Sequence, residues 1–146
     1  MRRTALLAAC APVIVAACGA TLWPVSKTQA HTYAPDVYQC AVTTTRNLGY
    51  KTFLSDTNAR RFEGRKEMPG KDYVEGDQYG FANVLAIHVL PNGTGSTLVV
   101  EARSLSEHMQ RTGHTEIPEY ASSDVLSDAQ QVRSTCVPAQ ATASSN

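Results

Sequence analysis

Two histidines with flanking glutamates lie close together in the chain between residues 104 and 121. Glu107 precedes His108, and Glu116 follows His114 after one intervening residue. Imidazole nitrogens and carboxylate oxygens are common protein ligands of zinc and related transition metals. The spacing of His108 and His114 matches neither a helical pair nor a zinc finger. A metal site is therefore one hypothesis for this segment, and solvated histidines are the other.

The sequence gives little support to nucleophilic catalysis. The segment Ser104-Leu105-Ser106-Glu107-His108 places serines near a histidine, but a catalytic triad is defined by its geometry in space. The chain has neither a G-x-S-x-G turn nor an S-x-x-K motif. Gly93-Thr94-Gly95-Ser96 joins two expected strands, whereas a phosphate-binding loop opens a helix. We therefore expect a non-catalytic protein without a cofactor. The alternative is a small hydrolase or metal-binding protein that uses residues 104–121.

A polar segment with tyrosines could form a recognition surface. Tyr73 and Tyr79 lie in the stretch 71–80 together with three acidic side chains. Tyrosine is enriched at protein interfaces because it combines a large apolar ring with a hydroxyl group. We expect 71–80 and 104–121 to be loops, and we regard both as candidate contacts for a protein or a glycan.

The N-terminus is organised like an export signal. Two arginines precede an apolar run over 4–15, which is too short to span a bilayer as a helix. The following Val15-Ala16-Ala17-Cys18 resembles the lipobox of bacterial lipoproteins. This resemblance implies cleavage before Cys18, a lipid on its sulfur, and membrane attachment through that lipid. Gly19 replaces the aspartate that typically retains such proteins in the inner membrane, which implies an outer-membrane location facing the periplasm.

A second cleavage site remains open in the sequence. Thr28-Gln29-Ala30 is an A-x-A-like site for an ordinary signal peptidase. Cleavage after Ala30 would release a protein that begins at His31 and carries no lipid, and the alternative function is then that of a soluble periplasmic ligand-binding protein.

The mature chain is long enough for a single domain. The lipoprotein interpretation divides the chain into a signal peptide (1–17), a tether (18–34), one domain (35–136) and a disordered tail (137–146). Loss of the two signal arginines from 13 basic and 13 acidic residues leaves 11 basic and 13 acidic side chains, a net charge of −2. This balance argues against a nucleic-acid partner, since binding to phosphates depends on clustered Lys and Arg.

The lipoprotein interpretation leaves two cysteines in the domain. The signal peptide contains Cys10, and the implied lipid occupies Cys18, so Cys40 and Cys136 remain. A disulfide is the default state of such a pair in an oxidising compartment. We expect this bond to close a loop that spans almost the whole domain, and to contribute about 4–5 kcal/mol in the chain-entropy model.

Hydrophobic periodicity predicts two helices and four strands. The helices are expected at 36–48, with Asp36 as the N-cap and Gly49 at the end, and at 122–136, with a cap among residues 122–124. The strands are expected at 50–55, 61–68, 81–90 and 97–103, with a hairpin turn at Asn92-Gly93. The order α-ββ-ββ-α predicts an α+β two-layer sandwich, in which two disulfide-linked helices cover an antiparallel four-stranded sheet.

Cys40 lies in the expected first helix, Leu48-Gly49-Tyr50 follows it, and an aspartate turn then precedes Gly64, which stands before a basic residue. In these features Cys40–Lys66 resembles small uncharacterised bacterial envelope lipoproteins. This resemblance implies a compact, lipid-tethered domain and provides no functional residues. The expected function is therefore a binding or structural role in the envelope, with a protein or a glycan as the partner.

Overall fold

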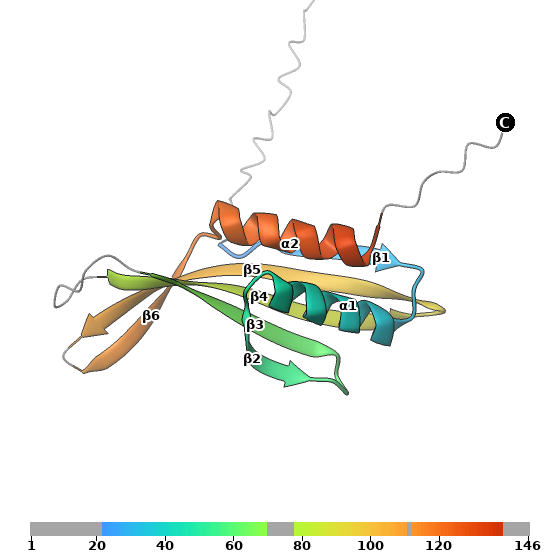
Figure 1. The fold of residues 1–146 in the computed structure, drawn as a ribbon, viewed down its shortest axis with the longest axis horizontal. Helices are drawn as coiled ribbons and strands as arrows, with labels where there is room; N and C mark the ends of the chain where they lie inside the picture. The colour runs from blue at the N-terminus through green and yellow to red at the C-terminus, as the bar shows by residue number, and fades with distance from the viewer. Residues whose placement is uncertain (1–21, 70–77, 111, 139–146) are drawn as a thin grey trace, which may run out of the picture.

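The protein is an α+β fold in which two helices lie side by side on one face of an antiparallel sheet (Figure 1). This computed structural model describes residues 22–69, 78–110 and 112–138. The elements in chain order are β1 (Val25–Ala30), α1 (Ala34–Asn47), β2 (Lys51–Asp56), β3 (Arg61–Pro69), β4 (Gln78–Asn92), β5 (Gly95–Gln110), β6 (Gly113–Glu119) and α2 (Ser123–Cys136).

The described residues form a sheet of six strands, so the prediction of four strands was wrong. The strand order is β1-β5-β4-β3-β2, and β6 also pairs with β5. β1 pairs with residues 96–101 of β5 and β6 pairs with residues 104–110, so the two extra strands lie end to end along one edge of β5. Both are edge strands with at most one buried residue, and their sequences lack the apolar alternation that marks a strand.

The extra strands change two expected segments. β1 falls within residues 18–34, which were expected to be a tether, and β6 falls within 104–121, which were expected to be a loop. β5 is also much longer than the predicted strand at 97–103, and its C-terminal half pairs with β6. The ends of β4 and β5 and the whole of β6 extend beyond the helices (Figure 1).

The helix ends follow the local sequence. The first helix begins two residues earlier than expected, with Pro35 in its first turn. Its N-cap is Tyr33, which makes no side-chain hydrogen bond. Asp36 therefore lies inside the first turn and is not the cap. Gly49 has a φ of 91°, the left-handed conformation that ends a helix without a steric cost. The second helix is capped by Ser122, whose hydroxyl accepts a hydrogen bond from the backbone N–H of Val125.

The hydrophobic core fills the space between the helices and one face of the sheet. Its largest fully buried side chains include Phe62, Leu85 and Leu98 from the strands and Val37 and Val125 from the helices. Gly64 of β3 lies beneath α1, and only a glycine fits at this position. An added Cβ would lie 2.9 Å from the Cβ of Tyr50 and 3.0 Å from the side chain of Thr45. The strand and helix are therefore in direct contact, which fixes the distance between the two layers.

The Cys40–Cys136 disulfide is present and joins α1 to the C-terminal end of α2, as predicted. Polar groups also connect α2 to the sheet side of the domain through Asp128 of α2. The Tyr50 hydroxyl donates to Oδ2 of Asp128 at 2.9 Å, and Nζ of Lys66 in β3 lies 3.4 Å from the same oxygen. Neither helix in the described residues is long and apolar enough to cross a membrane.

Candidate functional site

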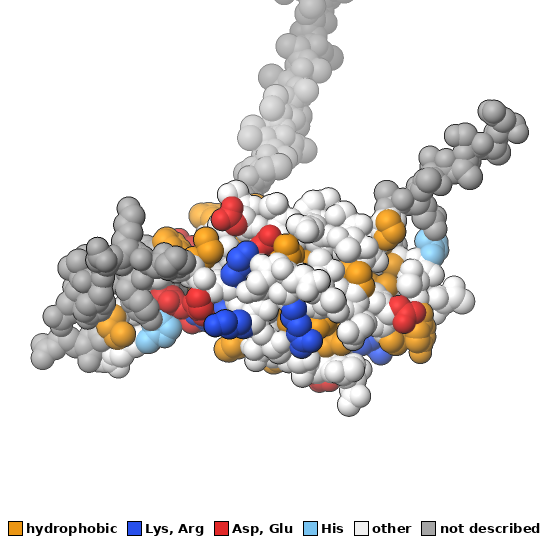
Figure 2. Space-filling view, in the orientation of Figure 1, with side chains coloured by type: hydrophobic (Ala, Val, Ile, Leu, Met, Phe, Trp, Pro, Cys, Tyr) orange, Lys and Arg blue, Asp and Glu red, His pale blue; other side chains and the backbone are white. Residues whose placement is uncertain are grey.

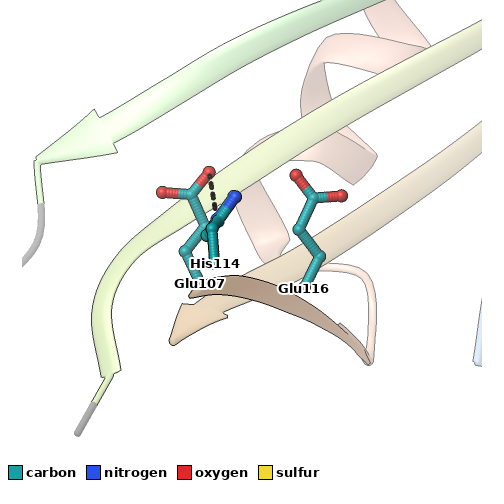
Figure 3. A group of neighbouring side chains, drawn as sticks. All are labelled: Glu107, His114 and Glu116. Atoms are coloured by element: carbon teal, nitrogen blue, oxygen red, sulfur yellow. Dashed lines mark ion pairs between the residues drawn. The ribbon is translucent and has the colours of Figure 1, made fainter. Parts of the chain in front are cut away.

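The structure brings together three of the four residues that could bind a metal. Glu107 of β5 is opposite Glu116 of β6, and His114 lies two residues before Glu116 on the same face. One ligand atom from each residue lies within 4.8 Å of the others, and Nε2 of His114 is 4.0 Å from Oε1 of Glu107 (Figure 3). His108 follows Glu107 in an extended strand, so its side chain lies on the opposite face of the sheet.

Arg65 of β3 already supplies a cation to this cluster. Its guanidinium forms ion pairs with Glu107 and Glu116, and with Glu67 of its own strand. Burial disfavours the charge on Arg65, but hydrogen bonds to Glu116 and Glu67 outweigh this effect and raise the pKa of Arg65 above its ordinary value. Acidic and basic side chains also lie next to one another over this part of the surface (Figure 2).

Gly80 makes room for this arrangement. A Cβ at Gly80 would lie only 2.7 Å from Oε2 of Glu107, so a larger residue in β4 would displace the Glu107 carboxylate. Glu107 itself is 9% exposed, and two of the three potential metal ligands contact Arg65. A metal ion would have to displace the guanidinium from Glu107 and Glu116, so the geometry favours an ion-pair network over a metal centre.

The serine and histidine singled out in β5 are in contact, but they are arranged unlike a catalytic triad. Nε2 of His108 lies 3.1 Å from Oγ of Ser106, and this hydroxyl donates to Oε1 of Glu119 at 2.8 Å. In a triad the carboxylate orients the histidine, whereas here it binds the serine directly. Ser106 is fully buried, so its hydroxyl is also inaccessible to a substrate.

A pocket that no sequence motif predicts lies beyond the N-terminus of α2. Its volume is about 410 Å³, which is within the range of small-molecule sites. It lies on the helix-covered face of the sheet, where β3, β4 and β5 extend past the helices. The pocket is lined by Met68, Phe81, Asn83, Ser104, Glu119, Tyr120, Ser122 and Asp124.

A buried polar network forms the base of this pocket. Oδ1 of Asn83 accepts hydrogen bonds from the hydroxyls of Ser104 at 2.7 Å and Ser122 at 3.1 Å. Each hydroxyl in turn accepts from a backbone amide: Ser104 from the N–H of Ser122, and Ser122 from the N–H of Val125. The network therefore joins β4 and β5 to the start of α2.

One sequence signal could have identified Asn83. It is the polar residue on the strand face that also contains Phe81, Leu85, Ile87 and Val89. A polar side chain at such a position is buried and needs hydrogen-bonding partners. The partners, Ser104 and Ser122, are separated from it by about twenty and forty residues and could be identified only from the fold.

The remaining predicted site residues are outside the described part of the protein. Cys18, Tyr73 and the side chain of Tyr79 belong to this group. Their proposed roles as a lipidation site and as binding residues therefore stay predictions.

Comparison with known proteins provides no functional assignment: no protein-family model matches the sequence, and no curated protein matches it either. Function is therefore inferred from the residues and their geometry.

Proposed function

We propose that this chain is a lipid-anchored protein of the bacterial cell envelope, attached through Cys18, whose domain has a non-catalytic binding role. The observation that carries the proposal is that β1 is an edge strand of the sheet, paired along its whole length with β5. Cleavage after Ala30 would remove the whole of β1 from the mature protein. Cleavage before Cys18 would keep it.

β1 is bound to the rest of the domain by several independent contacts. Ala30 is 7% exposed and belongs to the hydrophobic core. The hydroxyl of Thr28 accepts a hydrogen bond from Nε of Arg133 in α2 at 3.0 Å. The hydroxyl of Ser26 donates to the backbone carbonyl of Val100 at 3.3 Å. Removing β1 would break these contacts and leave the N-terminal half of β5 as an unpaired sheet edge, which favours aggregation.

The contacts continue upstream of β1. The carbonyl of Leu22 accepts a hydrogen bond from the N–H of Ala121, and the Trp23 ring packs against the guanidinium of Arg103 at 5.1 Å. The chain from Cys18 to Leu22 can span about 14 Å when extended. A lipid on Cys18 would therefore hold the domain close to the membrane surface, with a much shorter tether than residues 18–34.

The chemistry of the described residues favours binding over catalysis. The carboxylates of Glu107 and Glu116 are both paired with Arg65, and Ser106 is buried and bound to Glu119. Apolar side chains form several small, separate groups on the face in view, not one continuous patch (Figure 2). A small recognition site fits this surface better than an extended apolar interface does.

The lipid anchor is tested by substituting Cys18 with serine in the full chain, expressed in its own host. We expect the wild-type protein in the outer-membrane fraction and the Cys18→Ser variant released from it. Cys10→Ser makes the same chemical change within the signal and is expected to leave membrane attachment intact. Equal membrane attachment of all three proteins would contradict the proposal.

Tryptophan fluorescence gives an independent reading of the cleavage site. Trp23 is the single tryptophan of the chain and lies between the two candidate cleavage positions. A mature protein cut before Cys18 retains tryptophan emission, whereas a protein cut after Ala30 has none.

A further inference from the structure

We propose that the pocket beyond α2, here called the Asn83 pocket, binds a carbonyl-bearing ligand that has an apolar or aromatic group, carries no negative charge, and is about the size of one capped amino-acid residue. This inference rests on the proposed binding role and names the class of ligand that the domain would bind. It does not depend on how the protein is attached to the membrane.

The hydrogen-bond network fixes the orientation of the Asn83 amide. The hydroxyls of Ser104 and Ser122 both accept a hydrogen bond from a backbone N–H, so each has its own proton left to donate. Both hydroxyls lie within hydrogen-bonding distance of one end of the amide, which must therefore be the oxygen. The amide nitrogen consequently occupies the other end.

This amide nitrogen has no partner within the described residues. Asn83 is 3% exposed, and all of its hydrogen bonds in the described part of the chain involve Oδ1. Asn83 also lines the pocket, and we infer that Nδ2 faces it. Two N–H groups are thus available to a ligand, and a carbonyl oxygen is the acceptor that would bind them. A buried donor without an acceptor is costly, so a ligand carbonyl gains from filling this position.

The walls of the pocket are apolar around the amide. Met68, Phe81 and Tyr120 contribute this apolar surface. Phe81 is 44% exposed and Tyr120 is 66% exposed, so both rings are accessible from the solvent. An aromatic or aliphatic group between them would be removed from water on both sides, and aromatic pairs add further stabilisation through ring contacts.

The charge of the lining is negative. Glu119 and Asp124 are both acidic, and no Lys or Arg lines the pocket within the described residues. Glu119 accepts the Ser106 hydroxyl, and Asp124 lies in the first turn of α2. A carboxylate or phosphate ligand would lie next to these charges without a compensating cation. The pocket therefore selects neutral and positively charged ligands against anions.

Two small probes test this inference by differing in a single group. N-acetylphenylalaninamide has the ring, the carbonyl groups and no charge, and N-acetylphenylalanine replaces the terminal amide with a carboxylate. The binding of each probe is measured by equilibrium dialysis against the full mature protein in lipid nanodiscs. Empty nanodiscs give the background from partitioning into lipid. We expect saturable binding of the amide and at least tenfold weaker binding of the acid.

Three variants connect the binding to this pocket. Asn83→Asp keeps the acceptor for both serine hydroxyls but replaces the donor with an acceptor, and it is expected to weaken amide binding at least tenfold. Asn58→Asp makes the same chemical change in an exposed turn and should bind like the wild type. Phe81→Ala shortens an exposed wall residue, so it gives a second test if Asn83→Asp does not fold. We expect at least fivefold weaker binding from it.

The inference is overturned if the amide shows no saturable binding, if the acid binds equally well, or if the folded pocket variants bind the amide like the wild type. These results would leave the lipid anchor untouched, because membrane release of Cys18→Ser tests the anchor separately. Saturable amide binding together with unchanged membrane attachment of Cys18→Ser would support the pocket and refute the anchor.

Discussion

Reduction of the Cys40–Cys136 disulfide is expected to remove a large part of the free energy of unfolding. The two cysteines are separated by 96 positions in the sequence and link the two helices. Their covalent link restricts the unfolded chain far more than the folded domain, in which α1 and α2 already pack together. Reduction should therefore act mainly by increasing the conformational entropy of the unfolded state.

The length of the closed loop gives the magnitude. The chain-entropy relation assigns a loop of this size about 4.7 kcal/mol at 25 °C. A typical domain has a free energy of unfolding of about 5–15 kcal/mol. The reduced protein would therefore retain a modest stability, and its melting temperature should fall by on the order of 20 °C.

Urea unfolding followed by circular dichroism, with and without reductant, measures this difference. The Cys40→Ser/Cys136→Ser variant is the control, because it should unfold like the reduced wild type and show no response to reductant. A difference below about 1 kcal/mol between the oxidised and reduced proteins would refute the reasoning, since it would mean that the unfolded chain is not restrained by the bond.

Three substitutions test other parts of the structure. Tyr50→Phe removes a hydrogen bond to the Asp128 carboxylate and should destabilise the domain by about 1.5–3 kcal/mol in urea unfolding; no loss would mean that this bond does not join the layers. Gly64→Ala inserts a methyl group between β3 and α1 and should cost about 1–3 kcal/mol by the same assay, and an unchanged midpoint would disprove the close contact. Burial, together with the neighbouring charges of Arg61 and Arg60, lowers the pKa of His88 below 6.5 in the folded protein, so the unfolded chain binds the proton first as the pH falls. Stability should therefore decrease below about pH 6.5, and His88→Gln should remove this part of the pH dependence; an unchanged pH profile would contradict it.

Much of the fold could be predicted because its signals are local. The helix over Ala34–Asn47 has an apolar face and a glycine at its end, and the hairpin between β4 and β5 has an Asn-Gly turn. Cys40 and Cys136 lie on the apolar faces of the two helices, and this placement in the sequence pattern already favours their pairing.

The missed elements depend on long-range pairing. β1 and β6 are edge strands without a regular apolar alternation, and each is stabilised by pairing with β5 and not by its own sequence pattern. The same holds for the sites. Register places Glu107 beside Glu116, but the contact with Arg65 is made across the sheet, from β3, over Gly80. The Asn83 pocket likewise combines residues from strands and a helix that no sequence motif connects.

The intact mass of the mature protein from its own membranes tests the central claim most directly. Lipid attachment at Cys18 with β1 retained predicts a polypeptide that begins at Cys18 and carries the additional mass of its acyl chains. The mass should also be lower by two hydrogens than that of the reduced protein, as one disulfide requires. A mass that begins at His31 without lipid would contradict the account, because it would mean that the sheet forms without β1.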